Sequence, residues 1–153
     1  MQLRLIAVGR IREAYVAAAC ADFRKRLAPY YSFEELEVRA ADGSDATRAM
    51  REEADRVVKF VRPGEPVWLL DRAGTHLSSV ALSERMTAVG NSGAGRLTLI
   101  VAGTYGAGER LRERADFLWS LSELTFLHEW ARAIVLEQLY RAAKIARNEP
   151  YHH

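Results

Sequence analysis

The sequence contains very little cysteine, no long hydrophobic run and almost no net charge. Its single cysteine, Cys20, excludes an internal disulfide and fits a reducing compartment, so a cytoplasmic protein is expected. No stretch of about 18 apolar residues is present, so neither a membrane span nor a membrane partner is expected. The start, MQLRLIAVGR, lacks the basic and long apolar regions of a signal peptide. A formal net charge of +2 is too small to identify a nucleic-acid partner by itself.

What the sequence does contain is typical of a globular protein. Hydrophobic residues make up 49% and charged residues 27% of the 153 positions, which suits a single domain over residues 1–153. The charge is unevenly distributed, with a net of +4 over residues 1–27 and of −5 over residues 34–55. A basic face of this kind can bind a phosphate backbone, and solvated surface charge explains it equally well.

Hydrophobic patterning predicts strands and helices in alternation. We expect strands over 3–8, 32–40, 66–71, 96–102 and 116–122, and helices over 12–28, 45–61, 78–91, 108–115 and 129–148. Such alternation indicates an α/β fold with a largely parallel sheet flanked by helices. Ligands of these sheets bind beyond the carboxyl ends of the strands, which here places Leu70, Ala102 and the segment after Trp119 at one rim.

The segment VAGTYGAGE, residues 101–109, places three glycines between a predicted strand and a predicted helix. This layout is used by nucleotide-binding proteins to hold phosphates. Here the order of the glycines is the reverse of the dinucleotide pattern, and no lysine follows Gly108 as in the phosphate-binding loop. A nucleotide-binding oxidoreductase or regulatory protein is therefore disfavoured. The residues alone leave open a purely structural turn or a site of close backbone approach to another ligand.

Several segments together resemble one known family. They are LRLIAVG at 3–9, WLLD at 68–71, LIVAGTYG at 99–106, SLSELTFLHEWAR at 120–132, LEQLYRAAKI at 136–145 and PYHH at 150–153. With these segments the sequence is similar, over its whole length, to the SPOUT-class family of ribosomal RNA large-subunit methyltransferase H. The resemblance implies a SPOUT-type α/β knot, in which the chain forms a C-terminal trefoil knot. Knots are rare, and periodicity alone does not predict one.

The resemblance also implies a site for the methyl donor S-adenosylmethionine, built from the backbone of three loops. Carried over by position, the donor-binding residues are Leu70, Ala102, Gly103, Leu121, Ser122, Glu123, Leu124, Thr125 and Phe126. Ala102 stands where the family has a glycine, and its methyl group is tolerated only with a negative φ. On this interpretation the glycine-rich loop lets the backbone approach the donor and holds no phosphate. No metal is expected, because no paired metal-ligand spacing is present.

The implied reaction is methylation of N3 of a pseudouridine in large-subunit (23S) rRNA on assembled ribosomes. The proton on N3 has to leave, so a base or a field that favours the anion is needed. His128 directly follows the donor loop and is a candidate catalytic residue. The alternative is that it serves only as a polar residue at the start of the last helix. His152, in the terminal PYHH segment, is a second candidate. The resemblance places that segment over the active site of a partner subunit. The alternative is that its two adjacent histidines are the remnant of a purification tag.

Arg141 is the third candidate catalytic residue. It matches the family within LYRA, and Lys144 and Arg147 follow it on the same helix. This basic stripe is expected to bind RNA phosphates or to shape the site, with a solvated helix face as the alternative.

The predicted helix over 129–148 is apolar on more than one side, so we expect the core to cover one side and a second copy the other. The resemblance likewise implies a homodimer whose active site uses both subunits and whose partner is the ribosome. Two further functions stay open. One is a related knotted methyltransferase that acts on tRNA, and the other is a ribosome-binding dimer without catalysis.

Overall fold

The computed structural model describes residues 1–151, in which strands and helices alternate throughout. The strands are β1 (Gln2–Val8), β2 (Ser32–Val38), β3 (Val67–His76), β4 (Arg96–Val101) and β5 (Phe117–Ser120). The helices are α1 (Ala14–Leu27), α2 (Ala46–Val58), α3 (Ser79–Asn91), α4 (Glu109–Arg114) and α5 (His128–Ala146). Every predicted strand and helix is present, so the α/β fold class is confirmed.

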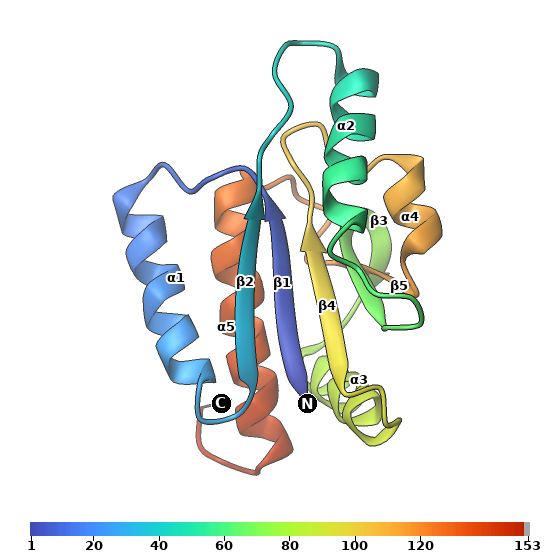
Figure 1. Ribbon diagram of the computed structural model, residues 1–153. Helices are drawn as coiled ribbons and strands as arrows, with labels where there is room; N and C mark the ends of the chain where they lie inside the picture. The colour runs from blue at the N-terminus through green and yellow to red at the C-terminus, as the bar shows by residue number, and fades with distance from the viewer. Residues whose placement is uncertain (152–153) are drawn as a thin grey trace.

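The five strands form one parallel sheet in the order β2-β1-β4-β3-β5 (Figure 1). Because all pairs are parallel, the carboxyl ends of the strands lie at one edge, at the top of Figure 1. The central strand β4 is buried from Leu97 to Val101, as expected for a strand covered on both faces. The loops that follow β3, β4 and β5 therefore come together at one rim.

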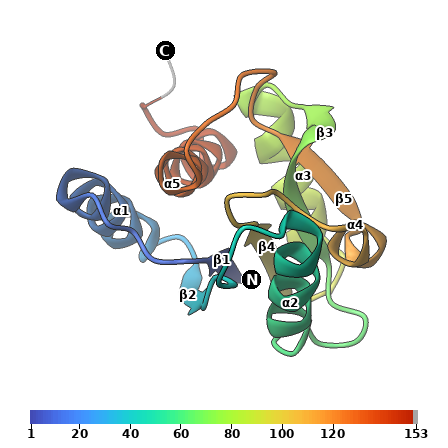
Figure 2. The ribbon, with the colours of Figure 1, turned by 90° about the horizontal axis from the view of Figure 1, so that it is seen from above.

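Helices cover both faces of the sheet, with α1, α3 and α5 on one side and α2 and α4 on the other (Figure 2). On the α5 side, side chains such as Leu5, Leu99 and Leu136 are completely buried. On the α2 side, Ile6 and Ile100 form the centre of a second apolar cluster. Neighbouring residues of one strand thus point into different clusters, which is the alternation that a two-sided sheet requires.

Two helices begin at side-chain caps. Asp45 Oδ1 accepts a hydrogen bond from the Arg48 backbone N–H at 3.0 Å at the start of α2. Ser78 Oγ accepts one from the Ala81 N–H at 3.1 Å at the start of α3. Each cap satisfies a backbone donor that the helix leaves unpaired, and such a cap stabilises a helix by about 1 kcal/mol.

Strand β3 is longer than the sequence predicted. It was expected to end at Asp71, but Thr75 and His76 pair with β5 after a bulge between Leu70 and Thr75. Gly74 allows this pairing, because a Cβ there would lie 2.6 Å from the backbone carbonyl of Leu118. The bulged residues stand at the carboxyl edge of the sheet, beside the loops that follow β4 and β5.

Helix α5 packs against both α1 and α3. The sequence predicts that a second copy covers the second apolar side of this helix. In the structure, much of that side is covered by α1 and α3 of the same chain. Trp130 remains 41% exposed and Leu127 71% exposed at its first turn. Within residues 1–151, no helix is long and apolar enough to cross a membrane.

Candidate functional site

A pocket of about 370 Å³ lies at the carboxyl edge of the sheet. Its walls come from the end of β3, the loop that follows β4, the segment between β5 and α5, and the first turn of α5. The volume is within the range of small-molecule sites. The location is the one at which parallel α/β sheets bind their ligands.

The structure brings almost all of the predicted donor-binding residues to this pocket. Those that line it are Leu70, Ala102, Gly103, Leu121, Ser122, Leu124, Thr125 and Phe126. Glu123 belongs to the same segment, but its side chain is exposed and does not line the pocket. The segment is held by Ser122, whose Oγ accepts from the Leu124 N–H at 3.1 Å and whose carbonyl accepts from Ser120 Oγ at 3.0 Å.

Gly103 forms the part of the pocket wall where backbone and neighbours approach most closely. A Cβ at this position would lie 2.7 Å from Glu53 Oε2 and 3.0 Å from Val8 Cγ1. The glycine is required by packing behind the loop. Gly106 has a different role, because its φ of 81° favours glycine and its N–H donates to the Gly103 carbonyl at 2.9 Å. Together the two glycines shape the turn that follows β4.

Ala102 is compatible with this turn although the family has a glycine there. Among residues 1–151, Asn148 is the only non-glycine residue with a positive φ, so Ala102 meets the condition that its methyl group imposes. The side chain is 9% exposed and belongs to the apolar cluster on the α2 side of the sheet. The substitution therefore leaves the backbone of the loop in an ordinary conformation.

Two arginines that the sequence analysis did not single out stand at the pocket. Arg112 of α4 donates from Nε to Asp71 Oδ2 at 2.6 Å. Arg72, in the bulge of β3, donates from Nη1 to Thr125 Oγ1 at 2.8 Å. Asp71 is the last residue of the strand predicted over 66–71, and Arg72 follows it. Their place at the end of that strand was the available signal for Asp71 and Arg72.

His128 begins α5 and lines the pocket, next to the predicted donor-binding segment. Its Nε2 lies 3.7 Å from the position that a Cβ on Gly9 would occupy. The half-buried imidazole thus lies between the pocket and the turn that follows β1. A side chain in this position can exchange a proton with a ligand in the pocket.

The first turn of α5 is tied to the loop between β1 and α1. Glu129 accepts hydrogen bonds from the backbone N–H groups of Arg12 at 3.0 Å and Glu13 at 3.1 Å. The bond from Arg12, followed by that from Glu13, lowers the pKa of the Glu129 carboxyl below its usual range. The carboxylate form therefore stabilises the arrangement that holds His128.

Arg132 reinforces this connection from inside the protein. It is 1% exposed and donates to the Gly9 carbonyl at 3.3 Å, to Glu37 Oε1 at 2.8 Å and to Glu35 Oε1. Sequence analysis placed Arg132 on the last helix without predicting its burial. A buried guanidinium with two carboxylate partners joins α5 to β2 and to the end of β1.

Arg141 is not brought to the pocket of its own chain. It lies thirteen residues after His128 on α5, which corresponds to roughly 20 Å along the helix axis. Its Nη2 donates to Glu137 Oε1 at 2.6 Å, and its guanidinium lies 4.6 Å from the centre of the Tyr151 ring.

The other cations of the predicted basic stripe also have partners within the chain. Lys144 donates to Glu149 at 2.6 Å, and the Arg147 guanidinium lies 4.6 Å from the centre of the Tyr30 ring. The remaining catalytic candidate, His152, lies outside the described residues.

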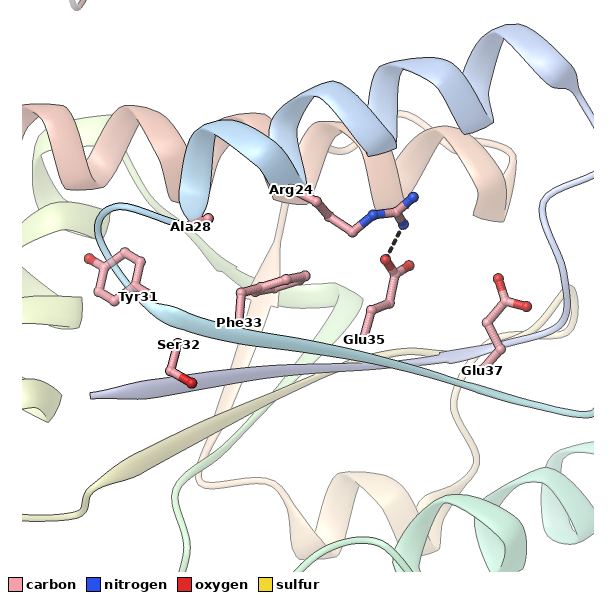
Figure 3. Close-up of a pocket in the computed structure, with 7 residues that line it drawn as sticks. All are labelled: Arg24, Ala28, Tyr31, Ser32, Phe33, Glu35 and Glu37. Atoms are coloured by element: carbon pink, nitrogen blue, oxygen red, sulfur yellow. Dashed lines mark hydrogen bonds and ion pairs between the residues drawn. The ribbon is translucent and has the colours of Figure 1, made fainter.

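A second, larger cavity of about 660 Å³ lies between α1 and the edge strand β2 (Figure 3). Glu35 points toward Arg24 of α1, with which it forms an ion pair, and Glu37 pairs with Arg132. None of the predicted site residues lines this cavity, and its carboxylates already have cationic partners. Within the described chain, no group of three or more His, Cys, Asp or Glu side chains is arranged to hold a metal ion. We therefore assign the functional site to the smaller pocket at the strand ends.

Comparison with known proteins identifies the family of this chain. Residues 1–152 match the family described as "Predicted SPOUT methyltransferase". A protein from Gloeobacter violaceus named "Ribosomal RNA large subunit methyltransferase H" is 42% identical over 153 residues, covering 100% of this chain and 99% of the relative. A relative of the same name from Pelobacter propionicus is 40% identical and covers 100% of both chains. Another, from Desulfitobacterium hafniense, is 36% identical over 158 residues and covers 99% of both.

A solved structure of a "probable methylase family protein" from Haemophilus influenzae Rd KW20 has a similar fold. The two structures align with a TM-score of 0.56 at 10% sequence identity, covering 99% of this chain and 70% of the other. At that identity the likeness concerns the fold alone. The family match and the relatives, in contrast, extend over practically the whole sequence. The chain therefore belongs to the SPOUT methyltransferase family.

Proposed function

We propose that this protein methylates N3 of a pseudouridine in large-subunit (23S) rRNA on assembled ribosomes, with S-adenosylmethionine as the donor. The observation that carries the proposal is the pocket at the carboxyl edge of the sheet, which is lined by loops from three neighbouring strands. The names of the relatives support the choice of rRNA as substrate. The same substrate supports a cytoplasmic location.

The residues present fit the donor. Backbone of Leu70, Ala102, Gly103 and the segment 121–126 would hold it, and Trp119 adds an apolar wall. Close packing behind Gly103 sets the shape of this wall before any ligand enters, which lowers the entropic cost of binding. When bound, S-adenosylmethionine supplies an electrophilic methyl group on a positively charged sulfur.

The chain itself has to position the acceptor base and remove the proton of N3. His128 is the residue of the pocket best placed to accept that proton, because its imidazole lies at the pocket wall and is held by the first turn of α5. Glu129 and Arg132 hold that turn through bonds to the loop after β1. Their role is to position His128 and not to contact the substrate.

We infer further that two copies form the active enzyme. Tyr15 of α1 and Trp130 of α5 are 59% and 41% exposed, and their ring centres lie 5.8 Å apart. Leu124 and Leu127 add 70% and 71% exposed apolar side chains on the neighbouring segment. A second copy of this chain would cover such a surface. Arg141 and His152 would then act at the pocket of the other copy.

The proposed architecture is one SPOUT domain over residues 1–153. The C-terminal trefoil knot remains a prediction from the family resemblance. Transfer to tRNA, or binding to ribosomes without catalysis, would be a different function for the same fold.

The proposal is tested in two steps. Isothermal titration should show binding of S-adenosylmethionine and no comparable binding of NAD or ATP. Labelled donor is then incubated with ribosomes from cells that lack the modification, with free rRNA and with tRNA. We expect label in large-subunit rRNA from the ribosomes. Label in tRNA would identify tRNA as the substrate in place of rRNA. Donor binding without any transfer would contradict the proposed catalysis.

A further inference from the structure

Two exposed side chains at the rim of the pocket are not among the predicted donor-binding residues. Tyr105 lies in the loop that follows β4, and Arg72 lies in the bulge of β3. Both line the pocket. Because β3 and β4 are neighbours in the sheet, these two loops stand side by side at its carboxyl edge.

Arg72 presents a positive charge that no carboxylate neutralises. Its hydrogen bond goes to the neutral hydroxyl of Thr125 at 2.8 Å. Arg112 at the same rim differs, because it forms an ion pair with Asp71 at 2.6 Å. Among the residues that the structure describes, Arg72 has no ion-pair partner, and its side chain is exposed. A guanidinium in this state is suited to bind a phosphate through two parallel hydrogen bonds.

Tyr105 presents an aromatic ring at the rim of the same pocket. The residue is 42% exposed, and no aromatic ring of the described chain pairs with it. The turn that carries it is closed by the bond from the Gly106 N–H to the Gly103 carbonyl. An exposed ring on a defined turn is a surface on which an unstacked RNA base can pack.

We propose that Tyr105 and Arg72 form the binding subsite for the acceptor nucleotide. The ring of Tyr105 stacks on the base that is turned out of the RNA, and Arg72 binds the phosphate next to that base. The proposal rests on the proposed function, since it needs RNA as the acceptor. Enzymes that modify a base have to take it out of its stack, so a stacking surface beside the donor is required. Arg72 holds Thr125, one of the predicted donor-binding residues, by a hydrogen bond, so the acceptor subsite adjoins the predicted donor site.

The test compares Tyr105→Ala and Arg72→Gln with two conservative variants, Tyr105→Phe and Arg72→Lys. Matched controls are Phe60→Ala, which removes a 43% exposed ring away from the pocket, and Arg51→Gln, which removes an exposed charge on α2. Three quantities are measured for each protein. They are kcat/KM with undermodified ribosomes, the Kd for those ribosomes by co-sedimentation without donor, and the Kd for S-adenosylmethionine by calorimetry.

We expect Tyr105→Ala to lower kcat/KM and to weaken ribosome binding by roughly 5- to 100-fold, with Tyr105→Phe close to the wild type. Arg72→Gln should lower both and reduce the slope of log affinity against log salt by about one, with a smaller loss in Arg72→Lys. The donor Kd of Tyr105→Ala and all three quantities of both controls should stay within about twofold of wild type, since the ring of Tyr105 contacts the acceptor alone. Arg72→Gln also loses the bond to Thr125, so its donor Kd should change, but by less than its ribosome Kd.

Three results would overturn the subsite. The first is ribosome binding and kcat/KM unchanged in both Tyr105→Ala and Arg72→Gln. The second is a loss confined to donor binding, which would assign the two residues to the donor. The third is equal losses in the Phe60 and Arg51 controls. Absence of transfer by the wild-type protein would instead refute the proposed function. In that case ribosome binding by the same variants still decides whether the subsite exists.

Discussion

The side chain of Glu53, on α2, lies directly behind Gly103 in the wall of the pocket at the strand ends. Glu53 is 4% exposed, and its Oε1 accepts a hydrogen bond from the Ala41 N–H at 3.0 Å. Its Oε2 has no hydrogen-bond partner among the described residues and would lie 2.7 Å from a Cβ at position 103. A side chain packed this closely leaves no room for a Cβ on the loop at position 103. The shape of the pocket therefore depends on a residue that does not line it.

Replacing Gly103 by alanine should displace the loop after β4. We expect Gly103→Ala to weaken S-adenosylmethionine binding at least tenfold and to destabilise the protein by about 1–3 kcal/mol, because the new methyl group overlaps Glu53 and Val8. Calorimetry and urea unfolding measure the two effects. Gly90→Ala is the control, since no atom lies within 4 Å of its added Cβ and a helical alanine is favoured. Unchanged donor affinity in Gly103→Ala would show that the loop adapts.

The contact between Glu53 and Gly103 can be isolated by a double-mutant cycle. Glu53→Ala alone should cost about 1–3 kcal/mol, because the Ala41 N–H loses its buried acceptor. Combined with Gly103→Ala it should cost less than the sum of the two, by about 0.5–3 kcal/mol, since the shortened side chain makes room for the new methyl group. Strict additivity in urea unfolding would mean that the two residues do not interact.

The buried ion pairs of Arg132 should contribute strongly to stability. We expect Arg132→Met to destabilise the protein by about 3–5 kcal/mol, because Glu35, whose side chain is 9% exposed, and the Gly9 carbonyl lose their buried partner. Arg51→Met, at an exposed position on α2, is the matched control and should have little effect. A loss below about 1 kcal/mol in denaturant unfolding of Arg132→Met would show that the network is compensated elsewhere.

The sequence predicted the order and type of the elements but not these connections. The bounds of β4 and α5 were predicted well, because the apolar residues of these two elements show in the sequence itself that they are buried. The continuation of β3 past Asp71 was missed, since Gly74 reads as a turn signal and its pairing with β5 depends on a distant strand. The burial of Glu53 and Arg132 was missed for the same reason. Their partners come from elements that are adjacent only after the sheet has formed.

The lowered pKa of Glu129 makes part of the stability depend on pH. The fold favours the carboxylate, so its contribution is complete above the ordinary glutamate pKa of about 4.3 and is lost as the pH falls through the lower folded-state value. Glu129→Gln should therefore have a lower Tm than wild type at pH 6–7, and the gap should close in acid. The measurement is thermal unfolding of both proteins across this range. A gap that stays constant with pH would contradict the assignment of the shift to the bonds from Arg12 and Glu13.

Two copies of the chain should separate when a charge is placed on the exposed aromatic pair of α1 and α5. We expect Trp130→Glu to raise the dimer dissociation constant at least 30-fold, because a central aromatic contact contributes about 2 kcal/mol or more. Light scattering after gel filtration measures the state of each protein. Phe60→Glu, at an equally exposed ring elsewhere, should leave the dimer intact. A monomeric wild-type protein, or an unchanged dimer in Trp130→Glu, would exclude this surface as the interface.

Mapping the transferred methyl group decides whether a pseudouridine of the large ribosomal subunit is the acceptor. Undermodified ribosomes are incubated with labelled S-adenosylmethionine and either wild-type protein or Gly103→Ala, and the rRNA is digested and analysed by mass spectrometry. The account predicts one label on N3 of a large-subunit pseudouridine with the wild type and a strongly reduced label with the variant. A label on another base, on small-subunit rRNA or only on tRNA would contradict it.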